Sequence, residues 1–246
     1  MPYATVCDYQ MYYEDQGQGV PLVLLHGGLS TSADWAPLVP TYARHYRVLA
    51  TDRRGYGRSS PRPGFERGYL YHDAQHLAAF LDGLPVTRAH VMGHSDGGSI
   101  ALLLAVERPD LVRSLVAVAA HTHAEDKTLE GLRDVQRLLR TSERFRQGLN
   151  RRLGPGGAAL AEVWYAHWLD PAQTVLDIRA QVSRIRCPTL VIQGLDDEFA
   201  HPDHARGIAQ AISGSQLWLI PDCGHAPHLQ YPEAFNERVL AFLAQH

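Results

Sequence analysis

Short apolar segments alternate with segments of helical character along most of this 246-residue chain. Continuous apolar runs are typical of strands that are covered on both faces of a parallel sheet. The pattern predicts strands at residues 9–14, 21–25, 46–50, 88–92, 115–118, 189–192 and 216–220, and helices near 72–82, 96–107, 203–213 and from 232 onward. Such alternation predicts the α/β class, with a doubly wound, mostly parallel sheet whose ligand site lies at the carboxyl ends of the strands.

Residues 121–185 interrupt this alternation, because no strand pattern occurs there. Two helical segments, residues 129–139 and 158–169, are separated by the glycine-rich break Gly154-Pro155-Gly156-Gly157. A chain of this length fits one domain that carries an insertion. We therefore expect a core formed by residues 1–120 and 186–246, with residues 121–185 inserted as a helical lid over the site.

The pentapeptide Gly93-His94-Ser95-Asp96-Gly97 lies between a predicted strand and a predicted helix. Its adjacent histidine, serine and aspartate cannot form a hydrolytic triad by themselves, because neighbouring side chains at such a turn point in different directions. Glycines two residues before and after the serine avoid a Cβ clash where a strand reverses directly into a helix. This G-x-S-x-G motif predicts Ser95 as a nucleophile whose partners come from elsewhere in the chain.

Candidate partners for Ser95 follow the last two predicted strands. His225 lies on the loop before the final helix, and the adjacent Asp196 and Asp197 follow the strand at residues 189–192. The chain order serine, acid, histidine is the order expected of a nucleophilic serine on an α/β sheet. Only one of the two aspartates can face the imidazole, and the order alone does not select between them.

Five segments in this order resemble the α/β-hydrolase superfamily, in its compact, lidded, esterase-like branch, over nearly the whole chain. They are Leu25-His26-Gly27-Gly28, residues 52–59, Gly93-His94-Ser95-Asp96-Gly97-Gly98, Gly194-Leu195-Asp196-Asp197 and Cys223-Gly224-His225. In the second segment, two glycines among charged residues predict a hydrogen-bonded turn that braces the loops of the site.

The resemblance implies roles for individual residues of the site. An acid three residues after Gly194 selects Asp197, but His201 stands where the family often has proline, which keeps Asp196 open. The resemblance also implies that the backbone N–H of Gly28 or Leu29 supplies one donor of an oxyanion hole and that of Asp96 the other. Fixed N–H groups of this kind stabilise the negative oxygen that forms during attack on an ester.

The side chain of Asp96 has two possible roles. Because it begins a helix, its carboxylate can accept hydrogen bonds from amides of the first turn, where negative charge is stabilised. Alternatively it faces the pocket and fixes a cationic group of the substrate. A free negative charge beside a developing oxyanion would raise the energy barrier of the reaction. The carboxylate must therefore be hydrogen-bonded within the protein or paired with a cationic group of the substrate.

Aromatic and histidine side chains are candidates for the substrate pocket. Trp35, His121, Trp164, His167 and Trp168 form this set, and the last three, at helical spacing, line the pocket or fill the interior of the lid. The run His121-Thr122-His123-Ala124-Glu125-Asp126 partly matches a metal-binding pattern, but its last two positions differ. We therefore expect no metal and no cofactor.

Composition excludes several classes of partner. A net charge of -3 gives no basic surface for nucleic acid, and no apolar run reaches the ~18 residues of a membrane span. Residues 1–10 lack the basic and apolar regions of a secretory signal. Cys7, Cys187 and Cys223 are odd in number and widely spaced, which indicates free thiols and a cytoplasmic location. The oligomeric state is left open.

These features predict a serine hydrolase that cleaves a small carboxylic ester through an acyl-enzyme, with water as the second nucleophile. Amide or carbon–carbon bond hydrolysis, perhydrolysis and lyase chemistry are alternatives, because a fold does not fix the reaction. A different class of function is a small-ligand receptor on the same scaffold that turns over slowly.

Overall fold

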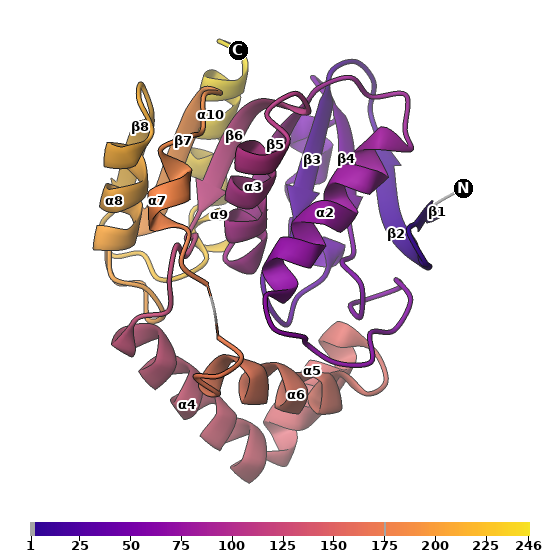
Figure 1. Ribbon diagram of the computed structural model, residues 1–246, viewed down its shortest axis with the longest axis vertical. Coiled ribbons are helices and arrows are strands. Elements are labelled where there is room, and N and C mark those ends of the chain that lie inside the picture. The colour runs from indigo at the N-terminus through magenta and orange to yellow at the C-terminus, as the bar shows by residue number, and fades with distance from the viewer. Residues whose placement is uncertain (1–2, 175) are drawn as a thin grey trace.

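The computed structural model describes residues 3–174 and 176–246, whose strands form one eight-stranded sheet in the order β1-β2-β4-β3-β5-β6-β7-β8 (Figure 1). β1 and β2 pair antiparallel, as do β2 and β4, and all other neighbours are parallel. The strands are β1 (Tyr3–Val6), β2 (Tyr9–Gln16), β3 (Pro21–Leu25), β4 (Arg47–Thr51), β5 (Ala89–His94), β6 (Val112–Val118), β7 (Thr189–Gly194) and β8 (Gln216–Ile220). The predicted doubly wound, mostly parallel sheet is confirmed.

Helices cover both faces of this sheet. One core contains residues of α2 (Tyr69–Asp82), α3 (Asp96–Glu107), α7 (Arg179–Val182) and α8 (Asp203–Ala211), which lie in front of the sheet in Figure 1. The other core contains residues of the 3-10 helix η1 (Ser32–Trp35), α1 (Val39–Tyr42) and α10 (Pro232–Leu243), with α9 (Pro227–Gln230) next to α10. Within the described residues, no helix is long and apolar enough to cross a membrane.

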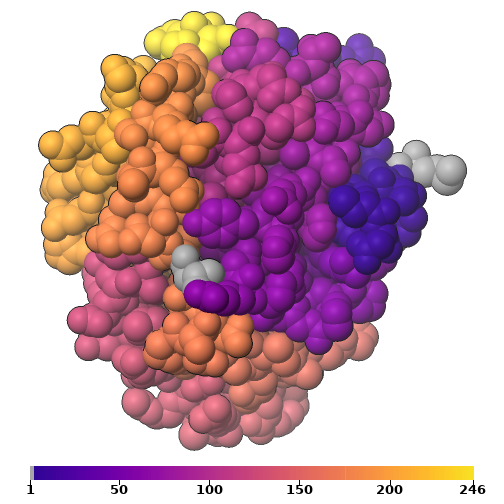
Figure 2. Space-filling view, viewed as in Figure 1, coloured from indigo at the N-terminus to yellow at the C-terminus, as the bar shows by residue number. Residues whose placement is uncertain are grey.

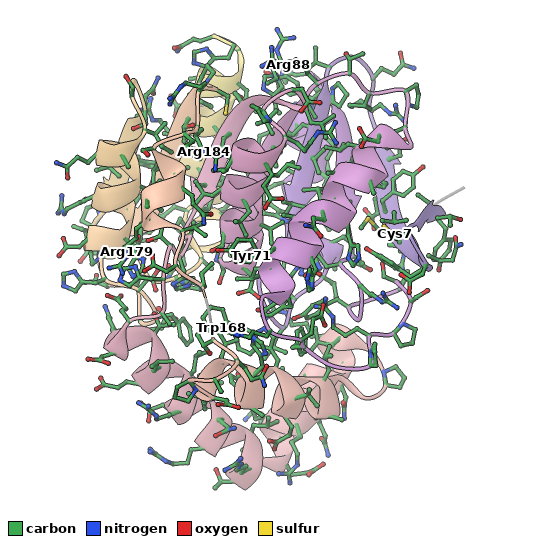
Figure 3. All side chains as sticks on the ribbon, viewed as in Figure 1. Cys7, Tyr71, Arg88, Trp168, Arg179 and Arg184 are labelled. Carbon is green, nitrogen blue, oxygen red and sulfur yellow. The ribbon has the colours of Figure 1, made fainter. Side chains whose placement is uncertain are left out.

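Three further helices lie between β6 and β7, namely α4 (Asp126–Thr141), α5 (Glu143–Leu153) and α6 (Gly157–Leu169). They pack on one another and lie together at one end of the sheet (Figure 1). In the space-filling view of Figure 2, their surface is continuous with the rest of the molecule. Trp168 of α6, labelled in Figure 3, lies where these helices meet the body of the protein. We call α4–α6 the helical insertion.

Several elements differ from those predicted. The strand β1, the short helices and α5 were not expected, and helix α2 begins three residues before the predicted position 72. Helix α5 buries only Leu149 and Leu153 among many charged residues, but Phe145, Leu149 and Leu153 recur at helical spacing, so the prediction missed a signal that the sequence carries. Helix α7, within residues 121–185, packs on α3 and α8 rather than on the insertion. Residues 1, 2 and 175 of the predicted core and lid lie outside the described residues.

Trp35 belongs to the core and not to the pocket. Its side chain is fully buried in the core that contains α1 and α10, and its ring stacks on that of His228 with centroids 4.6 Å apart. The prediction that Trp35 lines the pocket is therefore wrong. A tryptophan in the core and a tryptophan in a pocket look alike in the sequence, because both are apolar residues that follow a strand.

Two arginines and one aspartate form a buried ion cluster beside helix α2. Asp73 of α2 accepts hydrogen bonds from Arg53 at 2.9 Å and from Arg62 at 2.7 Å. All three side chains are at most 4% exposed. Because two positive groups share one carboxylate away from water, loss of that carboxylate leaves buried charge without a partner.

We predict that Asp73→Asn lowers the free energy of unfolding by about 3–5 kcal/mol, because two buried guanidinium groups lose their shared counter-ion. Asp82→Asn, on the same helix but about half exposed beside Arg108, serves as the control and should cost far less. Urea unfolding of both variants measures the difference. Equal losses would contradict a structural role for the buried cluster.

His228 generates a second prediction. Burial is the largest cause that lowers the pKa of this imidazole to about 4, from an ordinary value of 6.5. Between pH 6.5 and 4 the unfolded chain binds a proton there that the folded chain does not, so stability falls as the pH falls through this interval. His228→Leu should make that slope shallower, by up to about 1.4 kcal/mol per pH unit.

The measurement is the free energy of unfolding in urea at a series of pH values. The control is His45→Gln, which replaces an exposed histidine on the surface and should keep the wild-type slope. An unchanged slope in His228→Leu would show that the imidazole is protonated in the folded state as readily as in the unfolded chain.

Candidate active site

Ser95 lies on a strained turn between β5 and α3, with φ 55° and ψ −122°. A Cβ at Gly93 would overlap the backbone of Gly97, and a Cβ at Gly97 would overlap the carbonyl oxygen of Leu25. The Ser95 N–H donates to the carbonyl of Val118 at 2.9 Å, which ties the turn to the adjacent strand β6. A non-glycine residue at positive φ costs about 1–3 kcal/mol and persists only where its surroundings enforce it.

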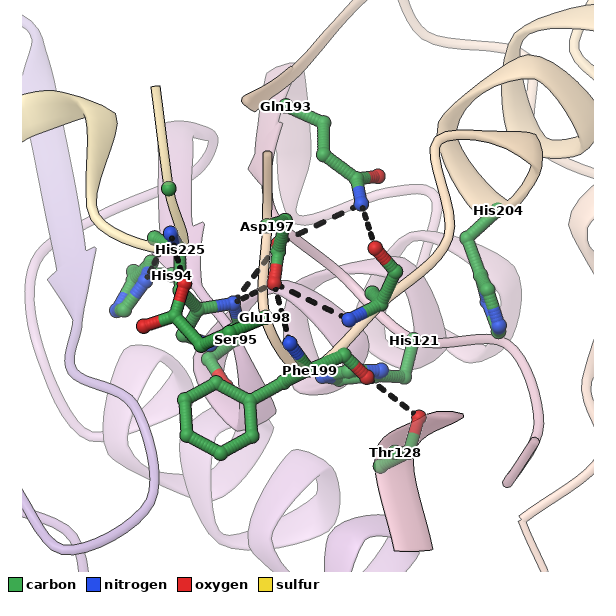
Figure 4. Close-up of polar contacts among 12 residues, drawn as sticks. His94, Ser95, His121, Thr128, Gln193, Asp197, Glu198, Phe199, His204 and His225 are labelled. Carbon is green, nitrogen blue, oxygen red and sulfur yellow. Dashed lines mark hydrogen bonds and ion pairs between the residues drawn. The ribbon is translucent and has the colours of Figure 1, made fainter. Parts of the chain in front are cut away.

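Asp197 and His225 are brought together from the loops after β7 and β8 (Figure 4). The Nδ1 atom of His225 lies 2.9 Å from each carboxylate oxygen of Asp197. Asp197 is fully buried and also accepts the N–H groups of Phe199 and Ala200. Asp196 is exposed, and its backbone N–H donates to the carbonyl of Cys223. The geometry therefore places Asp197, and not Asp196, against the imidazole.

The charge of this pair follows from its surroundings. Burial opposes ionisation of Asp197, but the hydrogen bond and charge of His225 and the Phe199 amide together lower the pKa of the carboxyl group. An ionised Asp197 holds the proton of His225 on Nδ1 and leaves Nε2 as the acceptor. His225 and Ser95 line the same cavity.

His94 and Phe199 contact the loop and the ring of His225, and no pattern in the sequence indicated these contacts. His94 Nε2 lies 2.8 Å from the carbonyl oxygen of His225, and the ring of Phe199 meets the imidazole edge-on with centroids 5.0 Å apart. Burial is the largest cause that lowers the pKa of His94 well below its usual value. Neutral His94 therefore donates from Nε2 to the loop that carries His225.

The residues predicted to donate to an oxyanion line the same cavity as Ser95. Within residues 3–174 and 176–246, the backbone N–H groups of Gly28, Leu29 and Asp96 donate to no other protein group, so all three are available to an oxyanion. The carbonyl of Gly27 is fixed by His26 Nδ1 at 2.7 Å and by Arg53 Nη2 at 2.8 Å. Because Gly27 C=O and Gly28 N–H share one peptide plane, these contacts also fix the direction of the Gly28 donor.

A cavity of about 460 Å³ opens at Ser95, a volume typical of small-molecule sites. The body of the protein contributes Gly28, Leu29, Ser95, Asp96, His121 and His225 to its wall, and the helical insertion contributes Leu132, Val135, Phe145, Leu149, Arg152, Trp164, Tyr165 and Trp168. Most insertion residues in the wall are apolar. The cavity is therefore enclosed by both parts of the chain.

The structure divides the predicted pocket residues. His121, Trp164 and Trp168 line the cavity. His167 does not, because its Nδ1 is hydrogen-bonded to the carbonyl of Phe65 at 2.9 Å and its ring packs edge-on against Tyr69. The expectation for His167 is thus wrong. Neighbouring residues of one helix face different directions, and helical spacing alone did not show which face of α6 meets the cavity.

The carboxylate of Asp96 is hydrogen-bonded by side chains. The first of its two possible roles, accepting hydrogen bonds from amides of the first turn of the helix, is therefore wrong. Its Oδ2 atom accepts from the hydroxyl of Tyr69 at 2.7 Å and from Trp164 Nε1 at 3.3 Å. The Nη2 atom of Arg53 lies 3.5 Å from the same oxygen. Asp96 thereby joins α3 to α2 and to the helical insertion, while it also lines the cavity.

His123, Glu125 and His204 place their potential metal-ligating atoms within 4.8 Å of one another. The rings of the two histidines are stacked, with centroids 4.4 Å apart and planes inclined by 19°. The Thr122 N–H donates to His204 Nδ1, which places the ring proton on Nε2, 3.3 Å from a Glu125 carboxylate oxygen. These contacts describe a pair between His204 and Glu125, with His123 stacked beside it.

The chain is similar in sequence and structure to known hydrolases. The serine hydrolase BPHL of Mus musculus is 29% identical over 95% of this chain and 82% of its own length. The 2-hydroxy-6-oxo-6-phenylhexa-2,4-dienoate hydrolase of Burkholderia cepacia is 26% identical over 96% of this chain and 92% of its own. The solved structure of Est816, an N-acyl homoserine lactone degrading enzyme, gives a TM-score of 0.82 at 26% identity, covering 98% of this chain and all of that one.

The model of the alpha/beta hydrolase family matches residues 22–238, which include β3, the turn at Ser95 and the loops of Asp197 and His225. A match of this extent on this sheet establishes the resemblance noted from the sequence. The chain belongs to the alpha/beta hydrolase family of enzymes.

Proposed function

We propose that this hydrolase cleaves a small carboxylic ester by nucleophilic catalysis at Ser95. One observation carries the proposal: a serine on an enforced, strained turn shares a cavity with a histidine that is anchored to a buried, ionised aspartate. A strained conformation enforced by neighbouring backbone is typical of a functional position. The relative BPHL, which is named a serine hydrolase, supports the same chemistry.

In the proposed mechanism His225 Nε2 accepts the proton of the Ser95 hydroxyl while Oγ attacks the ester carbonyl carbon. The N–H groups of Gly28 and Asp96 stabilise the negative oxygen of the tetrahedral intermediate. When the intermediate collapses, the ester C–O bond breaks, and His225 gives the proton to the leaving alkoxide. Water, deprotonated by the same imidazole, then attacks the acyl-enzyme, and the acid leaves as Ser95 regains its proton. Asp197 orients His225 throughout.

The lining of the cavity supports an uncharged substrate. The apolar wall formed by the helical insertion suits an uncharged acyl or alcohol group, and we propose that the insertion acts as a lid that excludes water. This chemistry requires no cofactor, and its partner is a small molecule. The three free cysteines support a reducing, cytoplasmic location.

A fluorophosphonate probe should label Ser95, and Ser95→Ala should lose both labelling and turnover while it stays folded. The physical reason is that the probe reacts only with an activated serine, and Ser99 is instead hydrogen-bonded to the backbone at His121. Mass spectrometry locates the label, and p-nitrophenyl acetate and butyrate report turnover. Labelling of Ser99, or full activity in Ser95→Ala, would exclude this mechanism; turnover too slow for an enzyme would favour a receptor.

The two adjacent aspartates supply a matched pair of variants. Asp197→Asn should lower kcat by up to ~10⁴-fold, because the imidazole loses the partner that sets its tautomer. Asp196→Asn changes an exposed carboxylate one residue away and should retain nearly full activity. Steady-state kinetics on the same ester measures both. If Asp196→Asn is the more damaging change, the assignment of the orienting acid is wrong.

Carbon–carbon bond hydrolysis is the second candidate. The relative from Burkholderia cepacia is named for a 2-hydroxy-6-oxo-6-phenylhexa-2,4-dienoate substrate, and it aligns with 96% of this chain. Spectrophotometric assays of that dienoate beside p-nitrophenyl butyrate separate the two candidates, because both substrates change absorbance on cleavage. A kcat/KM higher for the dienoate than for the ester would replace the ester proposal.

A further inference from the structure

The carboxylate of Asp96 lies in the cavity wall one residue from Ser95. A bare negative charge at this position would attract a cationic group of the substrate and would oppose the developing oxyanion. We propose that Arg53 is a specificity-determining residue, whose guanidinium neutralises Asp96 from within the protein so that the cavity prefers substrates without a positive charge near Ser95. The inference rests on the proposed function, since it concerns the same site and names its substrate class.

Arg53 is fixed in place as a counter-ion. Its side chain is 4% exposed, and its Nη2 atom lies 3.5 Å from Asp96 Oδ2. Nη1 binds Asp73 at 2.9 Å and Nη2 also donates to the Gly27 carbonyl at 2.8 Å. Its backbone N–H is held by His26 Nε2 at 3.0 Å, and the guanidinium lies over the ring of Tyr56. With these contacts the positive charge cannot swing away when a ligand enters.

The charges around Asp96 already balance. Arg53 and Arg62 are positive, Asp73 and Asp96 are negative, and all four side chains are nearly inaccessible to water. Tyr69 and Trp164 add neutral donors to Asp96 Oδ2. A substrate ammonium beside Asp96 would add a second positive charge near Arg53 in a buried, weakly screened setting. An uncharged group adds none, so the balance favours neutral substrates.

Two benzyl esters of the same shape test this inference. Benzyl 3-aminopropanoate carries an ammonium where benzyl butanoate carries a methyl group, and the ratio of their kcat/KM values reports the preference for charge. Wild type should favour the butanoate. In Arg53→Met, Asp96 loses its internal counter-ion, so the ratio should shift toward the amine by about tenfold or more.

Control variants isolate the charge. Arg53→Lys keeps a positive group and should keep the wild-type ratio, whereas Arg53→Met/Asp96→Asn removes both charges and should abolish the shift. Losses that affect both esters equally, such as a misplaced Gly27 carbonyl, cancel in the ratio. An unchanged ratio in Arg53→Met, or a wild-type preference for the amine, would overturn the inference.

A second variant guards against loss of folding, and a binding measurement tests the inference without catalysis. Arg53→Met/Asp73→Asn removes a balanced pair from the buried cluster and should show the same shift toward the amine. Calorimetric titration with phenylethylammonium and 2-phenylethanol requires no turnover. Arg53→Met and Arg53→Met/Asp73→Asn should bind the ammonium about tenfold more tightly than wild type does, whereas Arg53→Met/Asp96→Asn should not. If Ser95 is inert but the affinity for the ammonium rises in this way, the proposed reaction is wrong while the role of Arg53 stands. If the affinity for the ammonium does not rise, the role of Arg53 is refuted.

Discussion

The turn from β5 into α3 is the constraint on which the site depends. Strand and helix meet there without a loop, so Ser95 adopts φ 55°, and the backbone of Gly97 lies against Gly93 and against the carbonyls of Leu25 and His26. This packing holds because β3 and β6 flank β5 in the sheet. The strain is therefore supported by the central strands, which are the most buried part of the fold. The same packing aims the N-terminus of α3 at the cavity, where its dipole favours negative charge.

A chain of buried polar contacts connects this turn to the rest of the molecule. It runs from Arg62 through Asp73 and Arg53 to Asp96, and ends at Tyr69 and the tryptophans of the helical insertion. Breaking one member of such a cluster leaves others unpaired in a region of low dielectric, so its parts act as a unit. The cluster thus links the shape of the cavity to the loop that carries Gly28, the proposed oxyanion donor.

The helical insertion contributes the apolar part of the cavity but none of the proposed catalytic groups. Its helices pack mainly on one another, and Trp164 and Trp168 join it to the body through the hydroxyl of Tyr69. Gly28 permits this approach, because a Cβ at that position would overlap the ring of Trp164. The apolar wall of the cavity and the residues proposed for catalysis therefore come from different parts of the chain, which are in contact at a few residues.

Local patterns in the sequence determined strands β2–β8, the motif around Ser95 and the loops of His225 and the acids, but not the edge strand β1. Apolar runs and glycines at a sharp turn obey steric rules that act within a few residues, and such rules are visible in the chain itself. The short helices lack that signal, since tertiary packing stabilises them.

Tertiary structure alone decided which side chains meet. It placed Asp197 and not Asp196 against His225, buried Trp35 behind the sheet, turned His167 toward Phe65, and brought Arg53 to Asp96 across 43 positions of sequence. Adjacent residues with the same chemistry differ only in the direction in which the folded backbone points them. Partners from distant segments are selected by the packing of whole elements, and that packing is not encoded in any short stretch of the chain.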